Sequence, residues 1–437
     1  MLKKVYRELM ILGLLSFIIK LLTEVGGIDG YSGLMLAFQV SDLIIFILAI
    51  TLVLQAMNVL LLLNGYKRRA DRAELITTQD LIEAANAPPS SCCGGKQPSD
   101  ELLKKEVVQH RLLRHLFLVR FGLPQLFPFS KYIRRAQANN IVHMIEVEPS
   151  MWLLLLGMAW AFSVVVRILE GFEVEVRYEL IETLLAFAWV LVALHLLVLF
   201  YFRFCVRRLL AIAGYSKDKA VLAANLSAIA GEEAQAWQSE AAGSALDALN
   251  RIHAQLEELE HERKAARRGL LRADRSTSRE TGVLSDTPDL RLPLFSRKAW
   301  HVVVVFMAIL NGFFVSLLVM GAVYSFDEIY DKVGIFPVVL IPLPLIINGM
   351  FLQKSVFRDF VLISSILRID ASTLGEVVGH FSDIVELWSE FATSLILCLK
   401  ESGHSINDLD RALQSHDGKN TGLIDVDKLR VVLGSFI

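Results

Sequence analysis

Acidic side chains gather in and beside two short segments that separate very apolar parts of the sequence. Glu24 and Asp42 flank one of these segments, and Glu170, Glu179 and Glu182 flank the other. A mouth of carboxylates concentrates cations, and rings of Asp and Glu are a known means of cation selection. The alternative is that these segments are acidic only because the non-cytosolic loops of membrane proteins are poor in Lys and Arg.

Amide side chains also occur inside the apolar stretches, at Asn58, Asn311 and Asn348. Polar groups are costly in hydrocarbon, so each must find a partner or line a wet cavity. Asn311 lies near the middle of its stretch, and with the carboxylates it makes a candidate cation path. This path would comprise Glu24, Asp42, Glu170, Glu179, Glu182 and Asn311. The lone His195 is better explained by a hydrogen bond between helices than by catalysis.

A second candidate cation site lies near the C-terminus, where the sequence follows the register of an EF-hand loop. Asp417, Thr421, Leu423 and Asp425 take the first, fifth, seventh and ninth positions of that loop. Lysines stand at the third and twelfth positions, where the loop needs oxygen ligands. We therefore expect a helix–loop–helix, with calcium binding as the less favoured alternative and no other cofactor.

The sequence carries no motif of a known enzyme class. It has no phosphate-binding glycine loop, no nucleophile elbow and no H-E-x-x-H pair, and its 10 histidines are scattered. Its net charge of −2 gives no sign of nucleic-acid binding. We therefore expect neither catalysis nor a nucleic-acid partner.

Six apolar stretches must position these residues. The chain of 437 residues is 54% hydrophobic, with a mean hydropathy of +0.49. The apolar residues form blocks of roughly 20, the length of helix that crosses about 30 Å of hydrocarbon. The blocks are Val5–Glu24, Leu34–Asn64, Met151–Leu169, Leu180–Phe202, Trp300–Ser325 and Ile335–Leu352. The sequence predicts an all-α, polytopic membrane protein with about six transmembrane helices, the sixth kinked by Pro342 and Pro344.

Basic residues predict the orientation of these spans. They follow the second, fourth and sixth blocks, precede the first and fifth, and are nearly absent from the other three loops. Because cytosolic loops carry the excess of Lys and Arg, both termini are expected in the cytosol, with the plasma membrane as the expected location.

This orientation divides the chain into alternating membrane and cytosolic parts. Residues 1–64 hold spans one and two, residues 151–202 spans three and four, and residues 299–352 spans five and six. Between them lie cytosolic loops at 65–150 and 203–298, and residues 353–437 form a cytosolic tail. The second loop contains an amphipathic helix with Leu249, Ile252, Leu256 and Leu259 on one face, expected to pack on other cytosolic elements.

Several short runs resemble the MLO (mildew resistance locus O) family of membrane proteins. Phe127-Pro-Phe-Ser-Lys-Tyr-Ile-Arg-Arg135 is similar to the family's F-D-F-H-K-Y-I-K-R run, which also ends a long cytosolic loop. Glu8 falls in a run similar to its K-x-E-L-M-x-L-G-F, and Trp300 in one similar to its F-W-F-x-R-P-x-W. The residues that carry the resemblance are Glu8, Phe127, Phe129, Lys131, Tyr132, Arg134 and Trp300, and the matches are colinear over about residues 6 to 358.

The resemblance implies a calcium-permeable channel or calcium-signalling regulator, linked to defence and other responses to foreign organisms. Its implied partners are the lipid bilayer, calcium ions and, in the family, calmodulin, while homo-oligomerisation is left open. The family has seven spans, and the first match falls on its second, so one span is missing here. The stretch that matches the family's calmodulin-binding helix, Lys354–Ile369, holds three basic residues and no tryptophan, which argues against calmodulin.

A second function remains open beside the channel. The long cytosolic loops and the tail suit a membrane adaptor that conducts no ions and binds cytosolic partners through these segments. Neutralising the external carboxylates would change calcium permeability in a channel and leave an adaptor unaffected.

Overall fold

In the computed structural model the described residues are 33–75, 98–145, 176–268, 292–333, 342–416 and 426–436, with isolated residues between them. All regular structure in these ranges is helical, which confirms the all-α prediction for this part of the chain. The longer helices are α2 (Gly33–Leu75), α4 (Pro98–Phe121), α5 (Phe129–Ile145), α7 (Val176–Ile212), α8 (Lys219–Ser239), α9 (Ala242–Arg268), α10 (Arg297–Val333) and α14 (Ala371–Glu401). Shorter ones are α12 (Leu343–Ile346), the π-helix η1 (Ile347–Leu352), α13 (Gln353–Leu367), α15 (Ile406–His416) and α16 (Val426–Phe436).

Three of the described helices are long and apolar enough to cross a membrane. These stretches are Val40–Leu63 in α2, Leu185–Ile212 in α7 and Arg297–Met320 in α10. They coincide with the second, fourth and fifth predicted spans. The first and third predicted spans lie outside the described residues apart from isolated positions.

The sixth predicted span is described only from Pro342 on, and its earlier part lies outside the described residues. Pro342 is the N-cap residue of α12, and Pro344 lies in the first turn of that helix. Proline is tolerated at these positions, since the first N–H groups of a helix have no intrahelical partner. The irregularity falls one turn later, in η1.

Helix α2 is apolar on both of its faces. Its buried face carries Leu48, Leu52, Ala56, Val59 and Leu63, at successive spacings of three and four residues. Its exposed face carries Phe46, Ile50, Leu54, Met57 and Leu61, at the same spacing. A water-exposed helix face is normally polar, whereas a helix that is apolar all round belongs in a core or a membrane. The exposed apolar face of α2 is therefore typical of a helix suited to a membrane.

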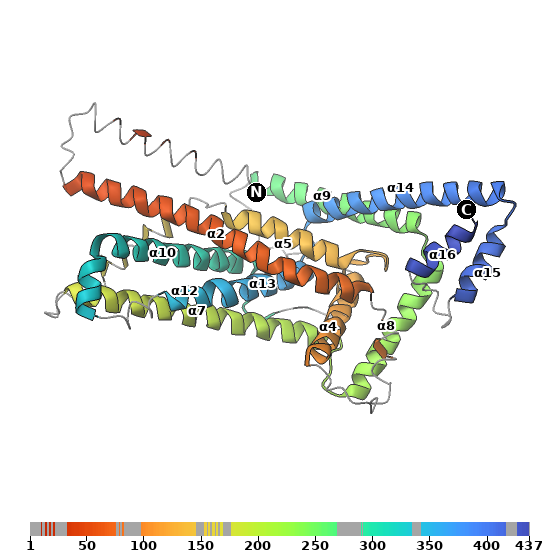
Figure 1. Ribbon diagram of the computed structural model, residues 1–437, viewed down its shortest axis with the longest axis horizontal. Coiled ribbons are helices and arrows are strands. Elements are labelled where there is room, and N and C mark those ends of the chain that lie inside the picture. The colour runs from red at the N-terminus through yellow and green to blue at the C-terminus, as the bar shows by residue number, and fades with distance from the viewer. Residues whose placement is uncertain are drawn as a thin grey trace.

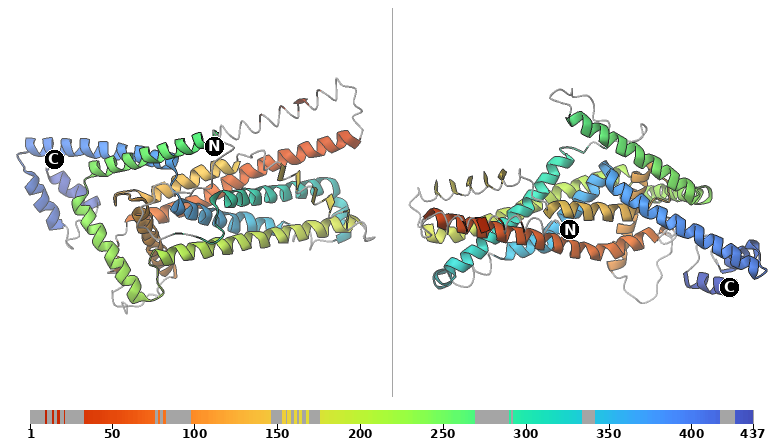
Figure 2. Two further views of the ribbon diagram at one scale, coloured as in Figure 1. Left: turned by 180° about the vertical axis from the view of Figure 1, so that it is seen from behind. Right: turned by 90° about the horizontal axis from the view of Figure 1, so that it is seen from above.

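The apolar stretches form an elongated bundle (Figure 1). In it α2, α7 and α10 lie alongside the continuous helix made by α12, η1 and α13. Helices α8, α9, α14, α15 and α16 lie toward the end of the bundle at which α2 and α7 finish and α10 begins (Figures 1 and 2). We call α4, α5, α8, α9 and α14 the helical cap.

Helices α2 and α10 pack antiparallel at close range. The Ser316 hydroxyl donates to the Ile44 carbonyl at 3.3 Å, and one turn earlier on α10 a Cβ added at Gly312 would lie 2.7 Å from Leu48 Cδ1. Each step forward along α2 therefore corresponds to a step back along α10. By this register Leu63, which ends the apolar stretch of α2, lies level with Arg297, which begins that of α10.

An aromatic cluster holds the cap together. The Phe117 ring contacts Phe121, Phe129 and Tyr132 at centroid distances of 5.0, 5.1 and 5.2 Å. Aromatic rings at such distances add to the stability that their buried area provides. Three residues of the predicted amphipathic helix, Leu249, Ile252 and Leu256, join the same core, as expected, while Leu259 is exposed.

Candidate functional site

Five residues with amide side chains lie close together inside the bundle, linked by side-chain and backbone contacts. Gln55 and Asn58 come from α2, Asn311 from α10, Asn348 from η1 and Gln353 from the start of α13. All except the half-buried Asn58 are buried, with Asn348 only 1% exposed. We call these five residues the amide seam.

Gln55 lies at the centre of the seam. Its amide contacts the Gln353 amide at 2.8 Å. In the other orientation of the Gln55 amide, which replaces the bond that Gln353 Nε2 donates to Gln55 Oε1, its nitrogen donates to the Ala308 carbonyl at 3.2 Å, and its oxygen accepts from the Gly312 backbone and from Asn311 Nδ2, each at 3.3 Å. One side chain of α2 thus links α10 to α13.

The π-helix η1 carries Asn348 and lies against Asn58 of α2. Its wider turn is closed by the hydrogen bond that the Gln353 N–H donates to the Asn348 carbonyl, five residues earlier. Asn58 Nδ2 donates to the Gly349 carbonyl at 2.9 Å, so a side chain of α2 satisfies a backbone group within this irregular turn. Turns of this kind occur often at functional sites, and between apolar helices they persist where neighbours satisfy the backbone.

The chemistry available in the seam is that of neutral oxygen and nitrogen ligands. Three buried oxygens of the seam, Asn311 Oδ1, Asn348 Oδ1 and Gln353 Oε1, have no hydrogen-bond donor among the described residues. Buried side-chain oxygens normally accept a hydrogen bond, and amide oxygens are also ligands for hard cations such as Ca²⁺. The five members do not titrate, so the seam can bind water or a cation but cannot act as an acid or a base.

The predicted cation path is only partly assembled among the described residues. Asn311 lies in the seam, but Asp42 is half-buried near the start of the α2 span, about 20 Å along the axis from Gln55. Glu179 and Glu182 belong to the first turns of α7, where side chains are not described, and Glu24 and Glu170 lie outside the described residues. The one described carboxylate of the path is therefore separate from the seam.

Sequence reasoning missed Gln55 and Gln353, which make the central contact of the seam. Gln55 precedes Asn58 by three residues, which places both on one face of α2. This spacing was an available signal. His195, by contrast, does not bond between helices as expected, because its Nδ1 pairs at 2.8 Å with the Leu191 carbonyl of its own helix.

A charged junction joins the bundle to the cap. The Asp370 carboxylate caps α14 by accepting from the Thr373 N–H at 3.2 Å, and it forms an ion pair with Arg297 at 4.0 Å. The backbone N–H of Asp370 donates to the Tyr132 hydroxyl at 3.0 Å. Burial alone would raise the pKa of Asp370, but hydrogen bonds from Thr373 and Ser372, with the Arg297 charge, lower it on balance. A polar cavity of about 310 Å³ lies beside this residue.

The residues that carry the family resemblance divide by their surroundings. Phe127, Phe129 and Tyr132 are buried in the aromatic cluster of the cap. Lys131 and Arg134 line a second cavity on another face of α5. Trp300 stacks on Tyr201 with ring centroids 4.5 Å apart, while Glu8 lies outside the described residues. Packing explains the aromatic members of the run but not the basic ones.

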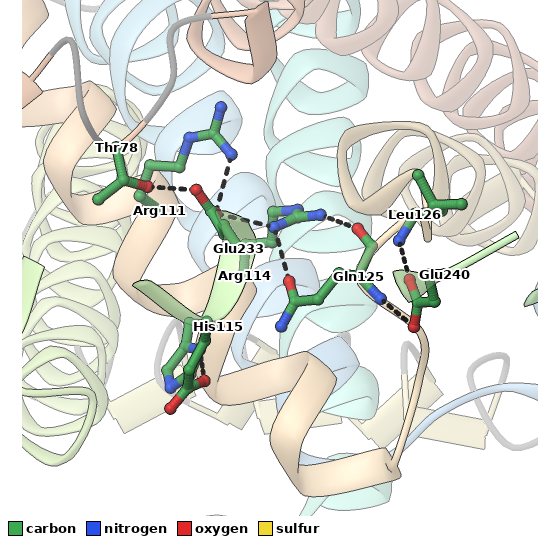
Figure 3. Close-up of polar contacts among 9 residues, drawn as sticks. Thr78, Arg111, Arg114, His115, Gln125, Leu126, Glu233 and Glu240 are labelled. Carbon is green, nitrogen blue, oxygen red and sulfur yellow. Dashed lines mark hydrogen bonds and ion pairs between the residues drawn. The ribbon is translucent and has the colours of Figure 1, made fainter. Parts of the chain in front are cut away.

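A buried carboxylate ties α8 to the rest of the cap (Figure 3). Glu233 Oε1 lies 3.3 Å from Arg111 Nη1 and 3.2 Å from Arg114 Nη1, and its Oε2 accepts from the Thr78 hydroxyl at 2.6 Å. Arg114 extends the network to Gln125, whose backbone N–H donates to Glu240 at 3.3 Å. Two arginines thus compensate one buried carboxylate, and the contacts fix α8 against α4.

The predicted helix–loop–helix has both of its helices. α15 and α16 pack through Leu409 and Val432, against Leu399 at the end of α14. The loop between them, with Asp417, Thr421, Leu423 and Asp425, lies outside the described residues. Elsewhere, the described residues contain no cluster of three His, Cys, Asp or Glu side chains that could hold a metal ion.

Comparison with known proteins adds no relative. No family model matches the sequence, no curated protein is similar to it, and no solved structure matches its fold.

Proposed function

We propose that this protein crosses the membrane about six times and forms, or regulates, a calcium-permeable path related to that of MLO proteins. The amide seam is the observation that carries the proposal. It brings neutral oxygen atoms from several helices together at mid-bundle, beside a π-helical turn, and three of these oxygens have no donor among the described residues. A permeating cation needs ligands that are favourable enough to enter and weak enough to leave, which suits neutral amides better than buried carboxylates.

The expected orientation agrees with this proposal. The last turns of α2 carry Lys67, Arg68, Arg69 and Arg72, beyond the apolar stretch that ends at Leu63, and the cap lies at this end. An excess of basic residues favours the cytosolic side, so the cap is cytosolic and both termini lie with it, at the plasma membrane. Asp42 and the start of α7, with Glu179 and Glu182, then lie toward the external end.

The resemblance supplies the ion and the biological role. The basic aromatic run of α5 and Trp300 lie where the cap meets the bundle, which suits residues that couple cytosolic signals to a path through the membrane. Calcium is accordingly the proposed ion, with defence and other responses to foreign organisms as the setting. The α15–α16 pair is a place at which calcium could act on the cytosolic side.

Calcium entry into cells tests this function. Cells that express the full chain and a cytosolic calcium reporter are supplied with external calcium after a calcium-free period. The proposal expects a rise that the D42N/E179Q/E182Q variant reduces several-fold, because the external mouth loses its negative potential. The matched control, E258Q/E262Q/E386Q, makes the same change in charge on exposed positions of the cap and should leave entry intact. No rise, with the protein shown at the cell surface, contradicts the proposal.

The exposed face of α14 favours an adaptor as the second candidate. The C-terminal half of this helix extends beyond α9, and its Leu387, Trp388 and Phe391 are 61%, 69% and 57% exposed (Figure 1). Apolar patches of this kind mark interaction sites. An adaptor would lose partner binding on W388A/F391A and would be unaffected by changes in the amide seam, whereas a channel would show the opposite pattern.

A further inference from the structure

A cavity on the outer face of α5 combines basic and apolar walls. It measures about 310 Å³, within the range of small-molecule sites. Leu60 and Leu63 of α2 form one wall, and Lys131, Arg134 and Arg135 of α5 form the other. The three cations stand at positions i, i+3 and i+4 and therefore share one face of their helix.

The cavity lies where the apolar part of the bundle ends. Leu63 is the last residue of the apolar stretch of α2, and the packing register places it level with Arg297 at the start of the α10 stretch. One turn further along α2, Lys67 begins a basic run. In a membrane-spanning helix this change from apolar to basic marks the level of the lipid headgroups.

The charges around the cavity are unevenly balanced. Arg135 pairs with Glu376 at 3.3 Å, and Asp383 lies near enough to Lys131 to favour its charged form. Burial, followed by the charges of Arg134 and Arg135, nevertheless lowers the pKa of Lys131. An anion in the cavity would favour the charged form of Lys131, which burial and the neighbouring arginines disfavour.

We propose that this cavity binds the phosphate headgroup of an anionic phospholipid, with the acyl chains along Leu60 and Leu63. Lys and Arg are the side chains that recognise phosphate, through charge-assisted hydrogen bonds. A soluble phosphate would not cover the apolar wall formed by Leu60 and Leu63. A phospholipid at this level carries both a phosphate, which can bind the basic wall, and acyl chains, which can cover the apolar wall. The inference rests on the proposed membrane insertion but not on ion conduction, and it gives the basic members of the α5 run a role that packing does not.

Binding of short-chain lipids to the purified full chain in detergent tests the inference. The probes are dioctanoyl phosphatidylinositol 4,5-bisphosphate, dioctanoyl phosphatidylcholine, and inositol 1,4,5-trisphosphate as the headgroup without chains. We expect the anionic lipid to bind at least about tenfold more tightly than either of the others. Equal binding of the lipid and the free headgroup would overturn the lipid assignment in favour of a soluble phosphate.

Paired variants locate the site. K131Q/R134Q removes two charges from the cavity and leaves the Arg135–Glu376 ion pair in place, and it should lower affinity for the anionic lipid about tenfold or more. R207Q/R208Q makes the same change on exposed positions near the end of α7 and should lower affinity no more than about twofold. Equal losses in the two pairs, or no loss in either, would overturn the site.

A charge-conserving variant separates binding from folding. K131R/R134K keeps both cations and should retain most of the affinity, whereas its failure to bind would show that packing of α5, and not charge, is responsible. Because the readout is lipid binding, the outcome is independent of calcium flux. Binding without flux would sustain this inference and count against the channel, and flux without binding would do the reverse.

Discussion

The amide seam and the Glu233 network bury polar groups in two different ways. In the bundle the five polar members are uncharged amides, shared among α2, α10, η1 and α13. In the cap, one carboxylate is buried between two arginines and a threonine hydroxyl. Burying a charge costs several kcal/mol, on the order of the whole stability of a small domain, unless partners compensate it.

This difference follows from the surroundings of each region. Between apolar helices an unpaired ion would pay its full desolvation cost, so amides are the less costly polar groups, and the buried carboxylate of Asp359 on α13 is paired with Arg203 at 2.9 Å. The cap helices are amphipathic and solvated on their outer faces. Charged groups just beneath those faces are therefore less fully desolvated. The seam is therefore suited to transient ligands and the network to fixed attachment, and each can be broken separately.

The largest effect is expected at Glu233. Replacing it with Ala removes the anion between Arg111 and Arg114, and uncompensated buried charge costs roughly 3–5 kcal/mol. We expect α8 to detach from α4, measured as a lower thermal unfolding midpoint and faster amide hydrogen exchange in α8. E232Q is the control, because the neighbouring Glu232 is exposed and its ion pair with His115 is a long one, at 3.7 Å. Similar midpoints for the two variants would contradict the assigned role.

His110 should make the cap sensitive to acid. Burial, with the charges of Arg111 and Arg114, lowers its pKa from 6.5 to about 4. Between these values the unfolded chain binds a proton that the folded cap excludes, so stability falls as pH drops from 6.5 toward 4, by about 3 kcal/mol in all. In H110Q this part of the loss should vanish, as followed by unfolding midpoints between pH 7.5 and 4.5. An unchanged pH dependence in H110Q would assign the sensitivity elsewhere.

Gly312 tests the close contact between α2 and α10. An alanine Cβ would lie 2.7 Å from Leu48 Cδ1, whereas at Gly349 the nearest atom, Asn58 Nδ2, would be 3.9 Å away. Overpacking of this kind costs about 1–3 kcal/mol, so G312A should be less stable than the wild type. G349A is the matched control and should change stability by under about 0.5 kcal/mol. Thermal unfolding in detergent measures both, and equal midpoints would refute the packing register.

The smallest effect is expected from breaking the seam itself. Q55L removes the contact with Gln353 and the acceptor for Asn311, and hydrogen bonds between membrane helices average only about 0.6 kcal/mol. We therefore expect a stability loss of about 1 kcal/mol or less, far below that of E233A. A loss as large as that of E233A would show that the seam is structural, which removes the reason to regard it as a path.

The positions of the apolar helices could be predicted from the sequence better than the contacts between them. The three described spans lie where blocks of about 20 apolar residues fall, because lipid imposes that length on any helix that crosses it. Gln353 was missed because a contact across 298 residues leaves no local pattern, whereas Gln55 could have been found from its spacing to Asn58. Asp42 and Asn311 were grouped by residue type alone, and the register of α2 against α10 separates them. The π-helix was not predicted, because the sequence offers no pattern for it beyond the prolines at which the described helix begins.

Calcium flux into liposomes that contain the purified chain tests the central claim most directly. The wild type should admit calcium, and N311L/N348L should reduce the flux at least about tenfold, because it removes two of the three donor-free oxygens proposed as ligands of the path. Q235L/N250L, the same exchange at exposed positions of the cap, should conduct as the wild type does. Equal flux through all three proteins, or none through the folded wild type, would contradict the amide seam as a cation path.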